Sequence, residues 1–268
     1  MTPRADARSP ARSATTLRSR ERTARRRGCA TLLAVTRRRT RSETERRADL
    51  DALLADPAAA WGTVMTVLST WPSDQAPDRA IAAVEAVADR WPPATRGLPR
   101  AAIRQLLAGD VRPHLRLVRA LDLRPLWSSR DRVALLDRLI AEGGVCELHT
   151  FIVRYDDGEA LLARLVRHVR GLRVLRLGGC RIGLPGARAL ADGPALAELR
   201  ELALHNNRID DDGAGALAGS PHLARLRTLN LYNNCPSRGT VAALRELYAA
   251  RGVRLQIHHQ RPPGADWP

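Results

Sequence analysis

The fold is decided by the stretch LRVLRLGGCRI at residues 172–182, which returns as LRELALHNNRI at 199–209 and as LRTLNLYNNCP at 226–236. The three copies align without a gap and start 27 residues apart. Leucines recur at positions one, four and six of each copy, and position nine is Cys or Asn. Apolar residues that alternate over such a short run indicate a strand, and the glycines that follow exclude one long helix.

Weaker copies extend this pattern in both directions. Steps of 27 residues lead back to Val145 and Val118, and forward to Val253, where Val253, Leu255 and Ile257 alternate. A unit of this length holds one strand, one helix and two connections. Since no unit can bury its own apolar face, at least about three must stack. The sequence predicts a repeat array over 118–258, with units starting near 118, 145, 172, 199 and 226 and a closing strand near 253.

This pattern resembles the leucine-rich repeat, in particular the ribonuclease-inhibitor-like subtype of bacterial type. The motif LxxLxLxx(N/C)x(L/I) is matched at 172–182 and 199–209, and at 226–236 as far as Asn234. The resemblance implies an α/β solenoid with parallel strands on the concave side and helices on the convex side. It also implies that the side chains at position nine bond to backbone inside the turn: Cys180, Asn207 and Asn234.

Alternation along each strand predicts which side chains face the concave side. With the leucines pointing inward, positions three, five and seven point outward. In leucine-rich repeat proteins this face generally binds other proteins, and arginine and aromatic side chains are the usual interface anchors. We therefore expect a partner-binding stripe, against the alternative of an ordinary solvated face without a ligand. The stripe comprises Arg124, Phe151, Arg176, His205 and Tyr232.

Residues 49–117 form a second region, which is predicted to be an all-helical block. Ser42 and Glu45 have the spacing of a capping box, which starts the first helix. This first helix ends at Asp56-Pro57, and the next two end at Trp71-Pro72 and at Trp91-Pro92-Pro93, because proline cannot continue a helix. Nothing in this block has the pattern of a catalytic site.

Charge is concentrated at the start of the chain. All 44 basic residues are arginine, and against 28 acids they give a net charge of +16. Residues 1–48 hold 15 arginines and 4 acids, hence +11, with few large apolar groups, which predicts a disordered arm. The arm could neutralise phosphates of nucleic acid or an acidic membrane surface. Alternatively it is a transit peptide, a solvated tail or sequence upstream of the true start. Residues 259–268 are predicted to be a tail.

Several function classes are disfavoured by what the sequence lacks. No apolar run approaches the length of a membrane span. The motifs GxSxG, GxxxxGK[ST] and HExxH are absent, and the scattered cysteines and histidines complete no zinc set. We expect no enzyme activity, no cofactor and no metal. The four cysteines form no CxxC pair, which favours free thiols in a reducing cytoplasm.

The sequence therefore predicts a cytoplasmic, non-enzymatic protein–protein interaction module that uses the concave face of its repeats, with a partner of unknown identity. The alternative is a nucleic-acid-associated protein that binds phosphates through residues 1–48, with the repeats as a docking scaffold.

Overall fold

The computed structural model divides the chain into two compact units, Met1–Asp49 and Leu50–Pro268. Most of the predicted arm lies outside the described residues, and so do Cys29, Cys146 and most of the predicted tail. The structure describes residues 42–72, 75, 77–110, 112–126, 128–141, 147–155 and 158–262.

Helix α2 (Glu43–Ala55) begins inside the segment expected to be the arm, so the helical region starts before residue 49. Its first turn is closed by the capping box that the sequence predicts. The Ser42 backbone N–H donates to Glu45 Oε2 at 3.0 Å, and the Glu45 N–H donates to Ser42 Oγ at 3.3 Å. Two amides that the helix leaves unpaired are satisfied in this way.

Short helices continue to residue 117. Tryptophans close their corners: the rings of Trp61 and Trp91 meet edge to face at 5.6 Å, and both indole N–H groups donate to backbone carbonyls, those of Gly97 and Ala59. Between Leu50 and Leu117 the described elements are α3 (Trp61–Ser69), α4 (Pro77–Glu85), η1 (Ala88–Arg90), η2 (Pro93–Thr95), α5 (Arg100–Leu107) and η3 (Pro113–Leu117).

His114, on η3, is 3% exposed and lines a small cavity of about 150 Å³ beside Trp71 and Ile81. Burial, and then the charge of Arg112, lower its pKa to about 4, although the carboxylate of Asp110 acts the other way. The ordinary value is near 6.5. The folded protein therefore holds this imidazole neutral at a pH where the unfolded chain protonates it.

Acid is therefore expected to destabilise the protein through His114. The stabilisation is complete above pH 6.5 and is lost as the pH falls toward 4. Between pH 7 and 4.5 the wild type should lose about 2 kcal/mol more of its free energy of unfolding than His114→Gln. Urea unfolding of both chains at the two pH values measures this difference. Equal losses in the two chains would show that His114 does not titrate in this way.

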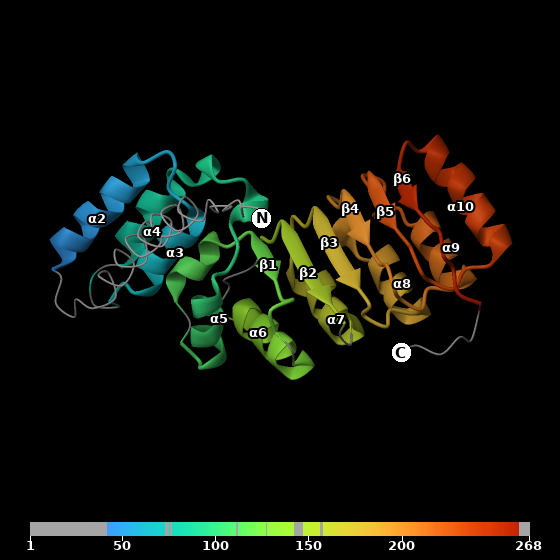
Figure 1. Ribbon diagram of the computed structural model, residues 1–268, viewed down its shortest axis with the longest axis horizontal. Coiled ribbons are helices and arrows are strands. Elements are labelled where there is room, and N and C mark those ends of the chain that lie inside the picture. The colour runs from blue at the N-terminus through green and yellow to red at the C-terminus, as the bar shows by residue number, and fades with distance from the viewer. Residues whose placement is uncertain are drawn as a thin grey trace, which may run out of the picture. The chain divides into compact units, whose positions relative to one another are not determined.

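The described part of the second unit contains one parallel sheet, with its strands in chain order (Figure 1). A helix follows each of the first five strands, so consecutive strands lie parallel, as right-handed crossovers require. The strands are β1 (Ala120–Asp122), β2 (Thr150–Arg154), β3 (Val174–Gly178), β4 (Glu201–Ala203), β5 (Thr228–Asn230) and β6 (Arg254–Gln256). The helices are α6 (Ser129–Ala141), α7 (Gly158–His168), α8 (Leu184–Ala191), α9 (Asp211–Gly219) and α10 (Arg238–Ala250), with η4 (Pro194–Leu196) after α8.

The strand register shows that the repeat length is not constant. Leu175 pairs with Leu202 and Leu202 with Leu229, which are steps of 27 residues as predicted. Phe151, however, pairs with Leu121 on one side and with Leu175 on the other, which are steps of 30 and 24 residues. The second unit therefore starts at Leu148, and the predicted start near 145 is wrong by three residues.

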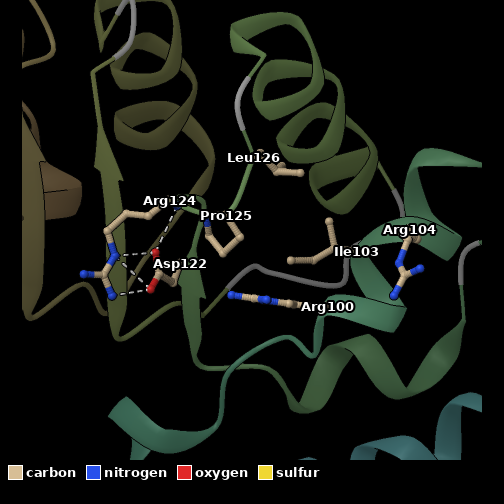
Figure 2. Close-up of a pocket in the computed structure, with 7 residues that line it drawn as sticks. All are labelled: Arg100, Ile103, Arg104, Asp122, Arg124, Pro125 and Leu126. Carbon is tan, nitrogen blue, oxygen red and sulfur yellow. Dashed lines mark hydrogen bonds and ion pairs between the residues drawn. The ribbon is translucent and has the colours of Figure 1, made fainter.

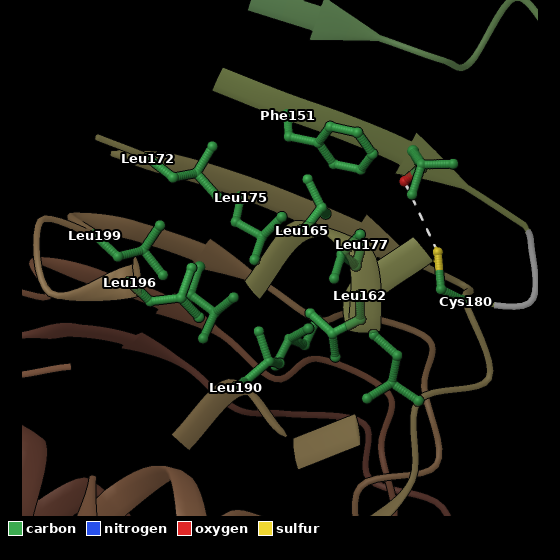
Figure 3. Close-up of a cluster of buried hydrophobic side chains, with 14 of the residues drawn as sticks. Phe151, Leu162, Leu165, Leu172, Leu175, Leu177, Cys180, Leu190, Leu196 and Leu199 are labelled. Atoms are coloured by element: carbon green, nitrogen blue, oxygen red, sulfur yellow. Dashed lines mark hydrogen bonds between the residues drawn. The ribbon is translucent and has the colours of Figure 1, made fainter. Parts of the chain in front are cut away.

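One apolar core runs between the sheet and its helices. Figure 1 shows α6 to α9 lying behind the strands, and Figure 3 shows the leucines of both layers pointing at one another. Ile103 and Leu106 of α5 belong to this same buried cluster. In addition, the carbonyl of Arg96 accepts the N–H groups of Arg119 and Ala120. The core of the repeats thus begins before the predicted boundary at 117.

Candidate functional site

The candidate site is the open face of the sheet, opposite the helices. Counting each unit from its first apolar residue, as in Leu172, the residues at positions four and six are buried against the helices. Positions three, five and seven point the other way. Position five carries Asp122, Ile152, Arg176, Ala203 and Asn230, and position seven carries Arg124, Arg154, Gly178, His205 and Tyr232.

The first two strands place an ion pair at one end of this face. The guanidinium of Arg124 binds the carboxylate of Asp122 through two nitrogens, with Nη2 2.6 Å from Oδ2. Burial alone would raise the pKa of Asp122, but its bonds to Arg124 and the charge of Arg154 hold that pKa below its ordinary value. Arg154 is exposed beside this pair.

The central strands add a second pair and a histidine. Arg176 Nε lies 2.6 Å from Glu201 Oε1 across β3 and β4. The ring of His205 occupies the space that a side chain on Gly178 would fill, since a Cβ there would come within 2.3 Å of Nε2. Burial, followed by the charges of Arg154 and Arg176, lowers the pKa of His205. The ring therefore lies between the charges of two arginines, which disfavour its protonated form.

Aromatic rings line the carboxyl ends of the strands. Tyr155 is 74% exposed, and one edge of its ring packs over Gly179. Farther along the same edge, after β5, the ring of Tyr232 contacts His258 at 5.0 Å and His259 at 5.5 Å between ring centroids. Tyrosine presents a large apolar body with a polar tip, which suits it to contacts with another protein.

One of the five residues predicted for the stripe does not lie on this face. Phe151 is 0% exposed and points into the core with Leu165 and Leu175 (Figure 3). The three-residue error in the start of its unit moved it from position four to position seven, which exchanges the two faces of a strand. Arg154 occupies position seven instead. The sequence does contain the correct start of this unit: Leu148-x-x-Phe151-x-Val153 also fits the LxxLxL pattern, 24 residues before Leu172.

The turn after each strand is built from backbone and buried polar side chains. Asn207 Oδ1 accepts the N–H groups of Cys180 and Ile182, and its Nδ2 donates to the carbonyls of Leu177 and His205. Asn234 bonds to backbone groups of two turns in the same way, and Gln260 does so after β6. The thiol of Cys180 lies 3.6 Å from the Gly178 carbonyl. The residue at position eight is left-handed in five successive units, with φ between 53° and 68°: Tyr155, Gly179, Asn206, Asn233 and His259.

A cavity of about 720 Å³ opens at the end of β1, beside Asp122 and Arg124 (Figure 2). Helix α5 contributes Arg100, which extends toward Asp122, and Arg104. Ile103 and Leu126 supply an apolar wall. A cavity lined by arginines and an apolar wall can receive a side chain that has an apolar stem and an acidic or polar tip.

The described residues include neither a cluster of metal ligands nor a helix that could span a membrane. Among them, no three His, Cys, Asp or Glu side chains gather as metal ligands would. None of the helices in this part of the chain has the length and apolar character needed to cross a bilayer.

Comparison with known proteins identifies the repeats. Residues 171–191 and 198–218 match the family model described as Leucine Rich repeat. These two stretches cover β3 with α8 and β4 with α9. No curated protein matches the chain. The chain therefore contains leucine-rich repeats, and such repeats generally mediate contacts between proteins.

Proposed function

We propose that the protein binds another protein through the open face of its sheet. The observation that carries this proposal is Tyr155, the one large apolar side chain that is strongly exposed among the described residues. It stands beside Arg154, on the same edge as His205 and Tyr232. We define the binding face as Arg124, Arg154, Tyr155, Arg176, His205 and Tyr232.

The chemistry of this face favours a specific partner over a general polyanion. Two of its arginines are already paired with acids, Arg124 with Asp122 and Arg176 with Glu201. Arginine and tyrosine contribute most to the binding energy of protein interfaces, because both combine a large contact area with directed hydrogen bonds. The cavity at Asp122 and Arg124 offers a place for one side chain of the partner.

We further propose a repeat subtype, an architecture and a cellular location for this protein. We assign the repeats to the ribonuclease-inhibitor-like subtype of bacterial type, because each strand from β1 to β5 is followed by a full α-helix of 8–13 residues. We also propose a solenoid that follows an N-terminal helical block, a role without enzyme activity, and a place in the cytoplasm.

Affinity capture from a nuclease-treated native lysate tests the proposal. The bait is the full chain, compared with Arg154→Ala/Tyr155→Ala/Tyr232→Ala and with a control, Arg167→Ala/His168→Ala/Arg188→Ala, on the exposed surface of α7 and α8. A protein retained by the wild type and the control should be reduced at least tenfold with the face variant. Equal retention by all three baits would refute the binding face.

A further inference from the structure

A second surface lies at the opposite ends of the strands. The residue at position two of each unit, just before its strand, accepts backbone N–H groups from the next unit with its carbonyl. Arg173 accepts from Arg200 and Glu201, and Arg200 accepts from Arg227 and Thr228. This ladder places successive position-two residues on neighbouring strands, about 4.8 Å apart. We call it the arginine row, and its members are Arg96, Arg119, His149, Arg173, Arg200 and Arg227.

Three members of the row are free to bind. Arg173, Arg200 and Arg227 are exposed, and none of them forms an ion pair with an acid in the described part of the chain. These arginines face solvent with their hydrogen-bonding capacity unused, although like charges so close together repel one another. A row of this kind is stabilised when an anion binds.

The other end of the row shows the effect of this crowding. Arg96 is 9% exposed, and its Nε has no hydrogen-bond partner among the described residues. Burial and the neighbouring charge of Arg119 lower its pKa. Burial also lowers the pKa of His149, and so do the charges of Arg173, Arg200 and Arg96. The carboxylate of Asp89 acts the other way, so the positive potential at this end of the row is only partly offset by an acid of the chain.

The chain itself shows which anion fits. The carboxylate of Glu147, a side chain 75% exposed, reaches Arg119 with Oε2 3.7 Å from Nη2. Guanidinium groups bind carboxylates and phosphates through two parallel hydrogen bonds. No member of the row is Trp, Tyr or Phe, so it lacks the stacking partners that single-stranded nucleic acid uses. The row is also one residue wide, with Glu201 immediately beside Arg200, which disfavours the broad phosphate surface of a duplex.

We propose that the arginine row binds an acidic segment of a partner protein, with several Asp or Glu side chains distributed along Arg173, Arg200 and Arg227. This inference goes beyond the proposed function, since it concerns the amino ends of the strands rather than the face at their carboxyl ends. The acidic ligand would bind to the row even if the binding face were not involved.

Titration of the full chain with a fluorescent peptide of ten glutamates, at 150 mM NaCl, tests the row. The row variant is Arg173→Gln/Arg200→Gln/Arg227→Gln. Its control, Arg167→Gln/Arg188→Gln/Arg238→Gln, removes the same charge from exposed helix positions. We expect the row variant to bind the peptide at least tenfold more weakly than the wild type, and the control to lose less than threefold. Circular dichroism before titration checks that both variants are folded.

Two other results would overturn the inference. If both variants lose affinity equally, or neither does, binding reflects net charge or other arginines of the chain. If single-stranded or duplex DNA of matched charge binds more tightly than the peptide and loses that affinity in the row variant alone, the ligand is nucleic acid. The row variant leaves all residues of the binding face unchanged. If it loses peptide binding, the two proposals can therefore be tested independently of each other.

Discussion

Phe151→Ala is expected to lower the free energy of unfolding by about 3–5 kcal/mol, because it removes a fully buried ring from the core between the sheet and its helices. Phe151 contacts a cluster that spans two neighbouring units, so the change leaves a cavity that neither unit can close alone. Chemical denaturation followed by circular dichroism measures the loss.

Ile152→Ala is the matched control for this experiment, since Ile152 is half-buried and points to the open face. It should cost less than about 1.5 kcal/mol. A larger loss at Ile152 than at Phe151 would mean that β2 has the opposite register, with Phe151 on the binding face after all.

Asn207→Ala is expected to cost about 3 kcal/mol, by a different mechanism. Four backbone groups, the N–H groups of Cys180 and Ile182 and the carbonyls of Leu177 and His205, lose a buried partner together. Each buried polar group left without a hydrogen bond costs about 1–3 kcal/mol, and rearrangement or an entering water recovers part of that. Thermal and urea unfolding both report the change.

Asn230→Ala provides the comparison for Asn207. Asn230 is half-buried and its side chain accepts one hydrogen bond, from the Tyr232 N–H at 2.9 Å. Its loss should cost less than about 1 kcal/mol, since water can replace the bond. Equal effects of the two substitutions would show that the turn does not depend on the side chain at position nine.

The sequence predicted the fold correctly where successive units start at a constant spacing. The units that start at 172, 199 and 226 keep a step of 27, and their strands pair as that step requires. The second unit could not be placed by the same rule, because the step from the first unit is three residues longer, 30, and the step to the third is three residues shorter, 24. A loop tolerates such changes at little energetic cost, whereas the strand register must keep Phe151 inside.

The site was predicted only in part, and the reasons are physical. Arg124, Arg176, His205 and Tyr232 lie at positions that alternation alone assigns to the open face. The packing of His205 over Gly178, and of Tyr155 over Gly179, depends on the missing side chains of two glycines in the neighbouring strand. The arginine row was overlooked for a similar reason. His149, Arg173, Arg200 and Arg227 each follow the first leucine of a motif, and only the backbone ladder shows that they are spatial neighbours of one another and of Arg96 and Arg119.

We propose above that the open face of the sheet binds a protein. The most direct test of this proposal is the affinity of the captured partner, once purified, for the wild type, for Arg154→Ala/Tyr155→Ala/Tyr232→Ala and for the control on α7 and α8. We expect a dissociation constant at least tenfold higher for the face variant and unchanged within twofold for the control. A face variant that binds as tightly as the wild type, while remaining folded, would contradict it.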